Sequence, residues 1–196
     1  MNRVVVGHFS VAISLREMIL RSRSERTTLH NCRKMINTKK VRDRRAVRFS
    51  TLDDVLRDAE VLAESARLGT LRATGNWSLG QALAHLATWV NMPFDGYPEM
   101  RPPAWWMRLL RPFITKWLVH KGFPAGVRIA GVPGGTFGIE PCEIDEGLAR
   151  LRSAYRRLAD KVPTQTSPVF GSLTHGEWIK FHFRHAELHL SFFHPQ

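Results

Sequence analysis

The most informative stretch of the chain is residues 178–190, which read WIKFHFRHAELHL. At about 100° per residue, a helix over this stretch gathers its charged and small polar side chains into one narrow strip. Aromatic and aliphatic side chains fill most of the remaining circumference, so we expect the helix to be buried on most sides. The strip that we expect to face solvent consists of Lys180, Arg184, Glu187 and Ser191.

Three histidines, His182, His185 and His189, lie on the side of this helix opposite the strip. A buried imidazole needs partners for its nitrogens, and an unpaired buried polar group costs about 1–3 kcal/mol. His185 and His189 are four residues apart, so both rings reach one ion from one helix. We therefore predict a divalent metal site there, with hydrogen-bonded core histidines as the alternative. For His182, a core position and a place beside the metal as a neighbour or fourth ligand stay equally open.

Helix-start patterns predict three further helices before this one. The first follows an S-x-x-D pattern at residues 50–53 and ends before Gly69; the second opens with a Ser78–Gln81 capping box and stops before Pro93. The third runs from about residue 145 to 162. The fourth is the helix that contains residues 178–190; it starts at the T-x-x-E box at residues 174–177 and runs to about residue 193. No useful two-residue alternation appears, so the fold class is all-α, a four-helix bundle.

Residues 93–142, between the second and third helices, hold eight prolines and many glycines. We predict a long insertion here, with one or two helical pieces broken near Pro112. In the second helix, His85 sits at the edge of the apolar face, at a position that suits a site opening toward solvent. His85 is the natural third ligand to the metal, beside His185 and His189.

The composition limits the possible compartment, membrane topology and binding partners. The chain has 196 residues, two cysteines and a net charge of +12. Two cysteines exclude a disulfide framework, which favours a reducing, cytoplasmic compartment. No apolar run approaches the roughly 20 residues that span a bilayer. Residues 1–45 carry 12 Lys and Arg against 3 Asp and Glu, so the charge is concentrated there and a uniformly basic nucleic-acid-binding domain is not expected.

We predict two parts, a basic and disordered extension over residues 1–45 and a helical domain over residues 46–196. A disordered tail, or an extension upstream of an alternative start at Met35, is the first interpretation of residues 1–45. A basic arm for nucleic acid or anionic lipid is the second, and an export signal is the third.

Two motifs resemble those of the DinB/YfiT-like superfamily, and its DUF1569 branch in particular. Residues 76–86 read NWSLGQALAHL and match the pattern W-S-x-x-x-x-L-x-H-L, while residues 170–190 resemble the closing motif. The resemblance covers residues 37–195 and implies a DinB-like four-helix bundle whose metal ligands would be His85, His185 and His189. The sequence departs from the commoner pattern at Leu188, where a second adjacent histidine is expected, and at Phe192.

The resemblance implies a divalent metal, most commonly zinc or nickel, and a thiol-dependent transferase acting on a small molecule with a low-molecular-weight thiol. A metal-dependent hydrolase and a non-catalytic metal-binding or stress-response module remain alternatives, and a homodimer is a further expectation. Cations of the insertion would meet an acidic co-substrate or simply be solvated: Arg101, Arg108, Arg111, Lys116, Lys121 and Arg128.

The aromatic residues of the insertion, with cations between them, also resemble a stretch that lies on a membrane surface. We expect Trp105, Trp106 and Trp117 instead to pack on the bundle, so membrane attachment is not the favoured interpretation.

Overall fold

The computed structural model describes residues 35–99, 105–129 and 132–196. The chain divides into two compact units, residues 1–35 and 36–196, and the second contains every helix and strand described. Its elements are η1 (Thr38–Lys40), α2 (Leu52–Arg67), β1 (Arg72–Ala73), α3 (Leu79–Asp95), α4 (Trp105–Lys121), η2 (Pro133–Gly135), α5 (Ile144–Asp160), α6 (His175–Leu190) and β2 (Phe193–His194). Most of the predicted extension, residues 1–34, lies outside the described residues.

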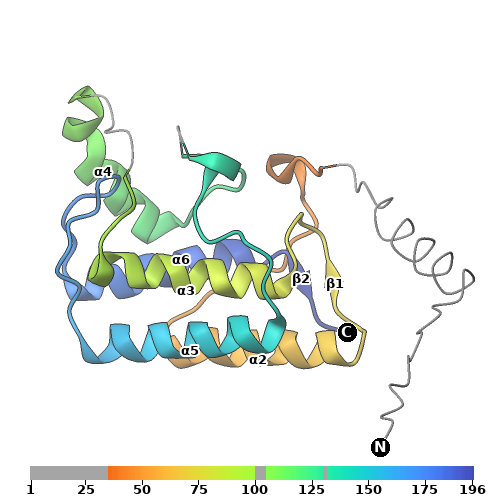
Figure 1. The fold of residues 1–196 in the computed structure, drawn as a ribbon. Helices are drawn as coiled ribbons and strands as arrows, with labels where there is room; N and C mark the ends of the chain where they lie inside the picture. Colours follow the sequence, from red (N-terminus) through yellow and green to blue (C-terminus); the bar gives the residue numbers. More distant parts are fainter. Residues whose placement is uncertain (1–34, 100–104, 130–131) are drawn as a thin grey trace, which may run out of the picture. The chain divides into compact units, whose positions relative to one another are not determined.

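Helices α2, α3, α5 and α6 pack around one core, and α4 packs against α6 (Figure 1). The largest fully buried side chains include Tyr155, Phe181 and Leu62. Two glycines, Gly80 and Gly147, allow close contact between the start of α3 and the first turns of α5. A methyl group at Gly80 would overlap the carbonyl of Cys142, and one at Gly147 would lie 2.7 Å from the carbonyl oxygen of Gly80. The structure is therefore all-α, as predicted, apart from one short strand pair.

The predicted helix starts hold with one correction. The capping boxes of Ser78 with Gln81 and of Thr174 with Glu177 are both formed. At the first helix the capping residue is Thr51 rather than Ser50, and the reciprocal bond comes from Asp54. Both registers fit the sequence pattern, but the Asp54 carboxylate accepts hydrogen bonds from the backbone N–H groups of residues 50 and 51 together.

Two proline-based boundaries were wrong. Helix α3 continues to Asp95 and includes Pro93, and α4 is a continuous helix through Pro112. A proline removes one backbone donor, and in α3 it does so only in the final turn. The Pro93 carbonyl there accepts hydrogen bonds from the backbone of Thr164 and Gln165. The expectation that the α4 tryptophans pack on the bundle was also wrong, since Trp105, Trp106 and Trp117 are all exposed.

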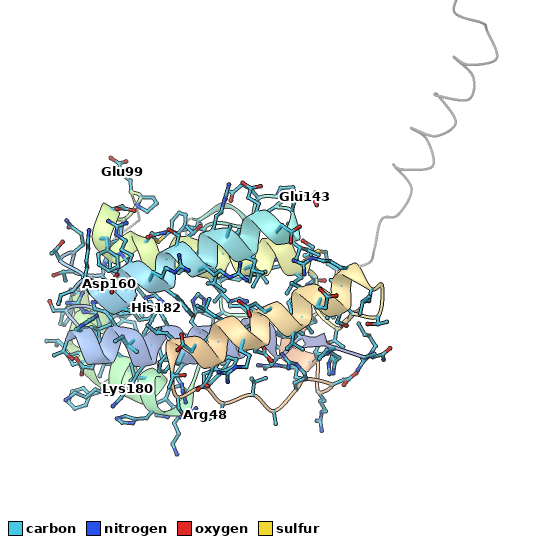
Figure 2. The ribbon with its side chains drawn as sticks, turned by 90° about the horizontal axis from the view of Figure 1, so that it is seen from below. Arg48, Glu99, Glu143, Asp160, Lys180 and His182 are labelled. Carbon is cyan, nitrogen blue, oxygen red and sulfur yellow. The ribbon has the colours of Figure 1, made fainter. Side chains whose placement is uncertain are left out.

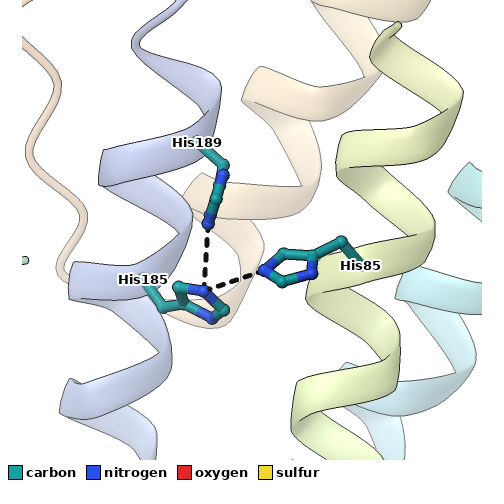
Figure 3. A group of neighbouring side chains, drawn as sticks. All are labelled: His85, His185 and His189. Atoms are coloured by element: carbon teal, nitrogen blue, oxygen red, sulfur yellow. Dashed lines mark hydrogen bonds between the residues drawn. The ribbon is translucent and has the colours of Figure 1, made fainter. Parts of the chain in front are cut away.

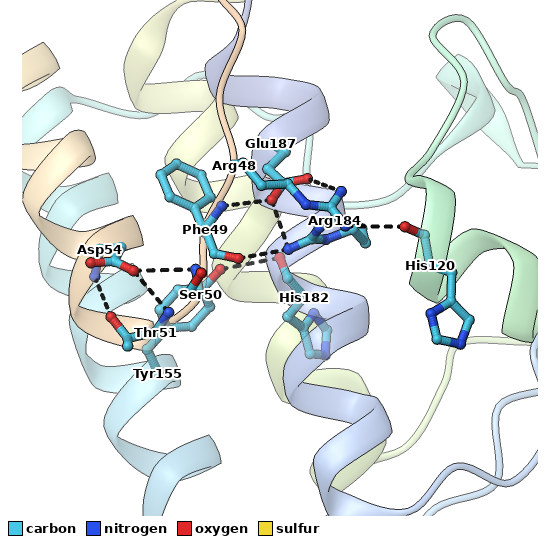
Figure 4. A network of polar contacts seen from close by, with 10 residues as sticks. All are labelled: Arg48, Phe49, Ser50, Thr51, Asp54, His120, Tyr155, His182, Arg184 and Glu187. Carbon is cyan, nitrogen blue, oxygen red and sulfur yellow. Dashed lines mark hydrogen bonds and ion pairs between the residues drawn. The ribbon is translucent and has the colours of Figure 1, made fainter.

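The polar strip of α6 does not face solvent as expected. Lys180 is exposed, but Arg184, Glu187 and Ser191 are buried. Arg48 and Phe49 contact Glu187 and Arg184 (Figure 4), and Arg44 donates a hydrogen bond to the Ser191 hydroxyl. Glu187 forms an ion pair with Arg184 at 2.8 Å and accepts a 2.7 Å hydrogen bond from the backbone N–H of Phe49, whose carbonyl accepts from Arg184 at 2.6 Å. The strip is therefore an internal seam between α6 and the chain that precedes α2.

The two strands were not predicted, because each has only two residues. They pair antiparallel, with Arg72 opposite His194 and Ala73 opposite Phe193, so the chain after α6 is held to the turn after α2. Figure 2 views the bundle from below, with Glu143 and Asp160 at the two ends of α5 and His182 between helices. Within the described part of the chain, no helix combines the length and apolar character needed to cross a membrane.

Candidate metal centre

The structure brings the three predicted ligands, His85, His185 and His189, together between two helices (Figure 3). His85 projects from the middle of α3, and His185 and His189 project from successive turns of α6. The Nε2 atom of His185 lies 3.2 Å from Nε2 of His85 and 3.1 Å from Nε2 of His189. One ligand atom from each ring lies within 4.8 Å of the others.

Aromatic rings line the histidine cluster. The ring of Trp77 stacks on His189 with 5.0 Å between centroids and 9° between planes, while Trp89 meets His185 edge-on at 5.7 Å. Phe123, which follows α4, lies 5.6 Å from the His185 ring. His85 is fully buried and His185 nearly so, and only His189 is partly exposed. The expectation that His85 lies at an edge open to solvent was therefore wrong.

Burial keeps these imidazoles neutral. Desolvation lowers the pKa of His85 to about 4, against a smaller opposing effect of its backbone hydrogen bond. The pKa values of His185 and His189 are well below the usual value, first because of desolvation and then because each ring faces the charge that its neighbours would carry. Neutral imidazole is the form that binds metal ions.

A loop carbonyl fixes the tautomer of His85. The Nδ1 atom lies 2.6 Å from the carbonyl oxygen of Phe137, which can only accept, so Nδ1 carries the hydrogen and Nε2 presents its lone pair to the cluster. The loop itself is held on α3 by a 3.0 Å hydrogen bond from Gln81 to the carbonyl of Ile139. Gly138 between them has φ +69° and lies against Thr88, a conformation and closeness that suit only glycine.

The donor set fits a divalent metal ion. A neutral His185 has either one hydrogen or one lone pair at Nε2, yet this atom faces two other ring nitrogens at once. A single proton therefore cannot make two good hydrogen bonds there, whereas three lone pairs converging on a cation are all satisfied. Ligands about 2.0–2.1 Å from a tetrahedral zinc ion lie roughly 3.4 Å apart, close to the two distances of 3.2 and 3.1 Å from Nε2 of His185. The other ring nitrogen of a metal-binding histidine usually donates a hydrogen bond. For His185 this atom, Nδ1, has no hydrogen-bond partner among the described residues.

Other candidate residues from the sequence lie apart from the cluster. His182 is buried, stacks on Trp178, and has no partner for either ring nitrogen among the described residues. It is therefore a core residue, and the group in the described chain that could hold a metal ion consists of His85, His185 and His189. Glu187 points into the seam with Phe49. Of the insertion's cations, Arg101 and the side chain of Arg108 fall outside the described residues.

Sequence reasoning missed two groups that shape the site. The Phe137 carbonyl carries no sequence signal, because any residue supplies one, although the glycine after it marked an unusual turn. Trp77 lies just before the capping residue of α3 and belongs to the first motif, but its place over the His189 ring was not predicted.

A mostly helical domain with three convergent histidines thus defines the class of protein: an all-α protein with a cluster of metal-binding geometry. The chain belongs to the DUF1569 family, described as "Protein of unknown function (DUF1569)", whose match covers residues 41–196. Comparisons with curated proteins and with solved structures gave no match.

Proposed function

We propose that this protein is a metal-dependent enzyme of the DinB-like type, with His85, His185 and His189 as ligands to one divalent ion, zinc or nickel. The observation that carries the proposal is that Nε2 of His185 lies 3.2 Å from Nε2 of His85 and 3.1 Å from Nε2 of His189, with all three ligand atoms within 4.8 Å of one another. When bound, the ion would lower the pKa of a thiol or a water molecule at its open position. The aromatic walls exclude bulk water, and the partly exposed edge at His189 gives a small molecule access.

We propose thiol-dependent transfer rather than hydrolysis as the reaction. Metal-assisted hydrolysis commonly uses a carboxylate beside the metal as a general base. The metal-binding group among the described residues includes no carboxylate, and Glu187, the nearest candidate in sequence, is engaged by Arg184 and Phe49. A thiol that ionises on the metal needs less help from a base. Small thiols such as glutathione, mycothiol and bacillithiol are the co-substrates to test.

The first experiment is elemental analysis of untagged protein purified without added metal. The wild type is compared with His185→Ala/His189→Ala and with a control, His120→Ala, whose ring is exposed and outside the cluster. We expect about one equivalent of metal in wild type and control, and none in the double variant with its helical circular dichroism retained. Absence of metal from the wild type, also after reconstitution with zinc or nickel, would overturn the proposal.

The second experiment tests the reaction. Each thiol is incubated with an electrophilic substrate, and S-transfer is followed for the metal-loaded protein, the chelated protein and the double variant. Transfer that requires both the metal and the histidines supports the enzyme. If metal removal lowers only the melting temperature and no thiol is transferred, the cluster is a structural site in a non-catalytic module.

A further inference from the structure

Helix α4 presents an apolar surface that no described residue covers. Of fourteen large apolar side chains exposed in the described residues, eight lie on this one helix. Trp105 is 75% exposed, Phe113 74% and Leu109 68%. The other six exposed apolar residues are spread over five separate segments of the chain. Scattered apolar residues are ordinary on a protein surface, but a continuous group of this size marks an interaction site.

The exposed side chains form one face of the helix. At about 100° per residue they cover an arc of roughly 200°, with Phe113 near its middle. The rest of the helix faces the protein, where Leu118 and Val119 are buried and Thr115 donates a 3.0 Å hydrogen bond to the carbonyl of Phe170. Helix α4 is therefore anchored to the fold through its second half and presents the apolar face outward, at the edge of the bundle (Figure 1).

Charge identifies the kind of partner. Helix α4 carries four cations, Arg108, Arg111, Lys116 and Lys121, and no acidic residue. Pairing with α4 of a second copy would bring two such sets of cations together without a counter-charge. A bilayer with anionic lipids supplies both an apolar interior and the opposite charge. Tryptophan rings, of which this face has three, favour the boundary between headgroups and acyl chains.

We propose that α4 is a membrane-surface helix that docks the protein on bilayers containing anionic lipid. At about 1.5 Å per residue its 17 residues extend roughly 25 Å, which is short of a bilayer core, so the helix lies along the surface. Trp105, Phe113 and Trp117 enter the headgroup boundary. Lys116 and Lys121 lie within the apolar arc, close to its two edges, and their long side chains reach lipid phosphates. Since most of the net charge of +12 lies in residues 1–45, the attraction of α4 itself to this surface comes from its own four cations. This proposal is independent of the metal site.

The test is flotation of the full chain with vesicles of phosphatidylcholine and phosphatidylglycerol at three to one, compared with phosphatidylcholine alone. The variant Leu109→Ser/Phe113→Ser removes two exposed apolar side chains and keeps every tryptophan as a fluorescence reporter. Leu68→Ser/Val162→Ser is the matched control, because these side chains are 68% and 59% exposed and lie away from α4. Lys116→Glu/Lys121→Glu tests the charge.

We expect the wild type and the control to float with the anionic vesicles and their tryptophan emission to shift to the blue. The apolar variant should partition about tenfold less strongly, and the charge variant should lose its preference for anionic lipid. Equal flotation of wild type and apolar variant would assign binding to the basic residues 1–45 and overturn the proposal. So would failure of the wild type to float, or a dimer in sedimentation velocity that the apolar variant converts to monomer.

Discussion

Replacing His182 with leucine should stabilise the protein, and more so in acid. The ring is buried among aromatic residues, stacked on Trp178 and edge-on to Phe181. Both of its nitrogens are without a partner among the described residues. Each buried nitrogen without a partner costs about 1–3 kcal/mol of stability, and leucine removes this cost. Imperfect packing of the new side chain, which has a similar volume, offsets up to about 1.5 kcal/mol of the gain. We therefore expect His182→Leu to raise the free energy of unfolding by at least about 0.5 kcal/mol at pH 7.

The pH dependence of the free energy of unfolding gives a second expected difference between His182→Leu and wild type. Desolvation lowers the pKa of His182 to about 3, whereas an unfolded histidine titrates near 6.5. Between these values the unfolded chain binds a proton that the native ring does not, so stability falls as the pH falls below about 6.5. At pH 5, which is about 1.5 units below the unfolded pKa, this single ring costs roughly 2 kcal/mol. His182→Leu should therefore gain about 2 kcal/mol more over wild type at pH 5 than at pH 7.

The assay is urea unfolding of chelated protein at both pH values, followed by circular dichroism. The control is His175→Leu on the same helix, whose ring makes a 2.6 Å contact with the carbonyl of Leu158 and so has a partner to lose. That variant should lose about 1 kcal/mol at pH 7. The reasoning is refuted if His182→Leu is less stable than wild type, or if its difference from wild type is the same at pH 5 and pH 7. Loss of metal from His182→Leu would further contradict a three-histidine ligand set.

Three other perturbations test the fold. Gly80→Ala should destabilise by about 2 kcal/mol or more in urea unfolding, because the methyl group meets backbone rather than a flexible side chain, whereas Gly176→Ala, with open space around it, should be neutral or slightly stabilising. Glu187→Gln should cost about 3 kcal/mol by leaving buried Arg184 without its charge partner, while Glu146→Gln, in an exposed pair with Arg150, should change stability by about 0.5 kcal/mol or less. Thr174→Ala should lower the free energy of unfolding by about 1 kcal/mol through loss of the α6 cap, and an unchanged value would contradict the capping box.

The sequence carried enough information to predict the helices and the histidine cluster because both depend on local spacing. Capping boxes span four residues, and the separation of His185 from His189 is about one helical turn. His85 could be matched to them because a third ligand is expected from a facing helix and His85 lies in the middle of the second helix. The start of α2 was displaced by one residue because Ser50 and Thr51 each offer a hydroxyl with an aspartate three residues on.

What the sequence did not predict depends on contacts between distant residues. The strip of Arg184, Glu187 and Ser191 has the composition of a solvated face, and only the position of residues 44–50 makes it a buried seam. The reverse error occurred on α4, whose tryptophans have the composition of a core and are exposed. In both cases the hydrophobic pattern of one helix was interpreted without knowing what lies against it. The Phe137 carbonyl, a backbone group, has no compositional signal at all.

Helix α6 shows why closeness in sequence does not identify the chemistry of this site. Glu187 lies two residues from each of His185 and His189, which places it about 200° around the helix from both. Its carboxylate therefore faces the seam, where burial raises its pKa and the Phe49 N–H and Arg48 oppose that effect. The histidines face α3 and stay neutral. Because the two faces are separate, Glu187→Gln should weaken the fold yet leave the metal content of the folded protein at the wild-type value. A carboxylate acting at the metal would require the opposite result, with metal affinity or thiol transfer lost before stability.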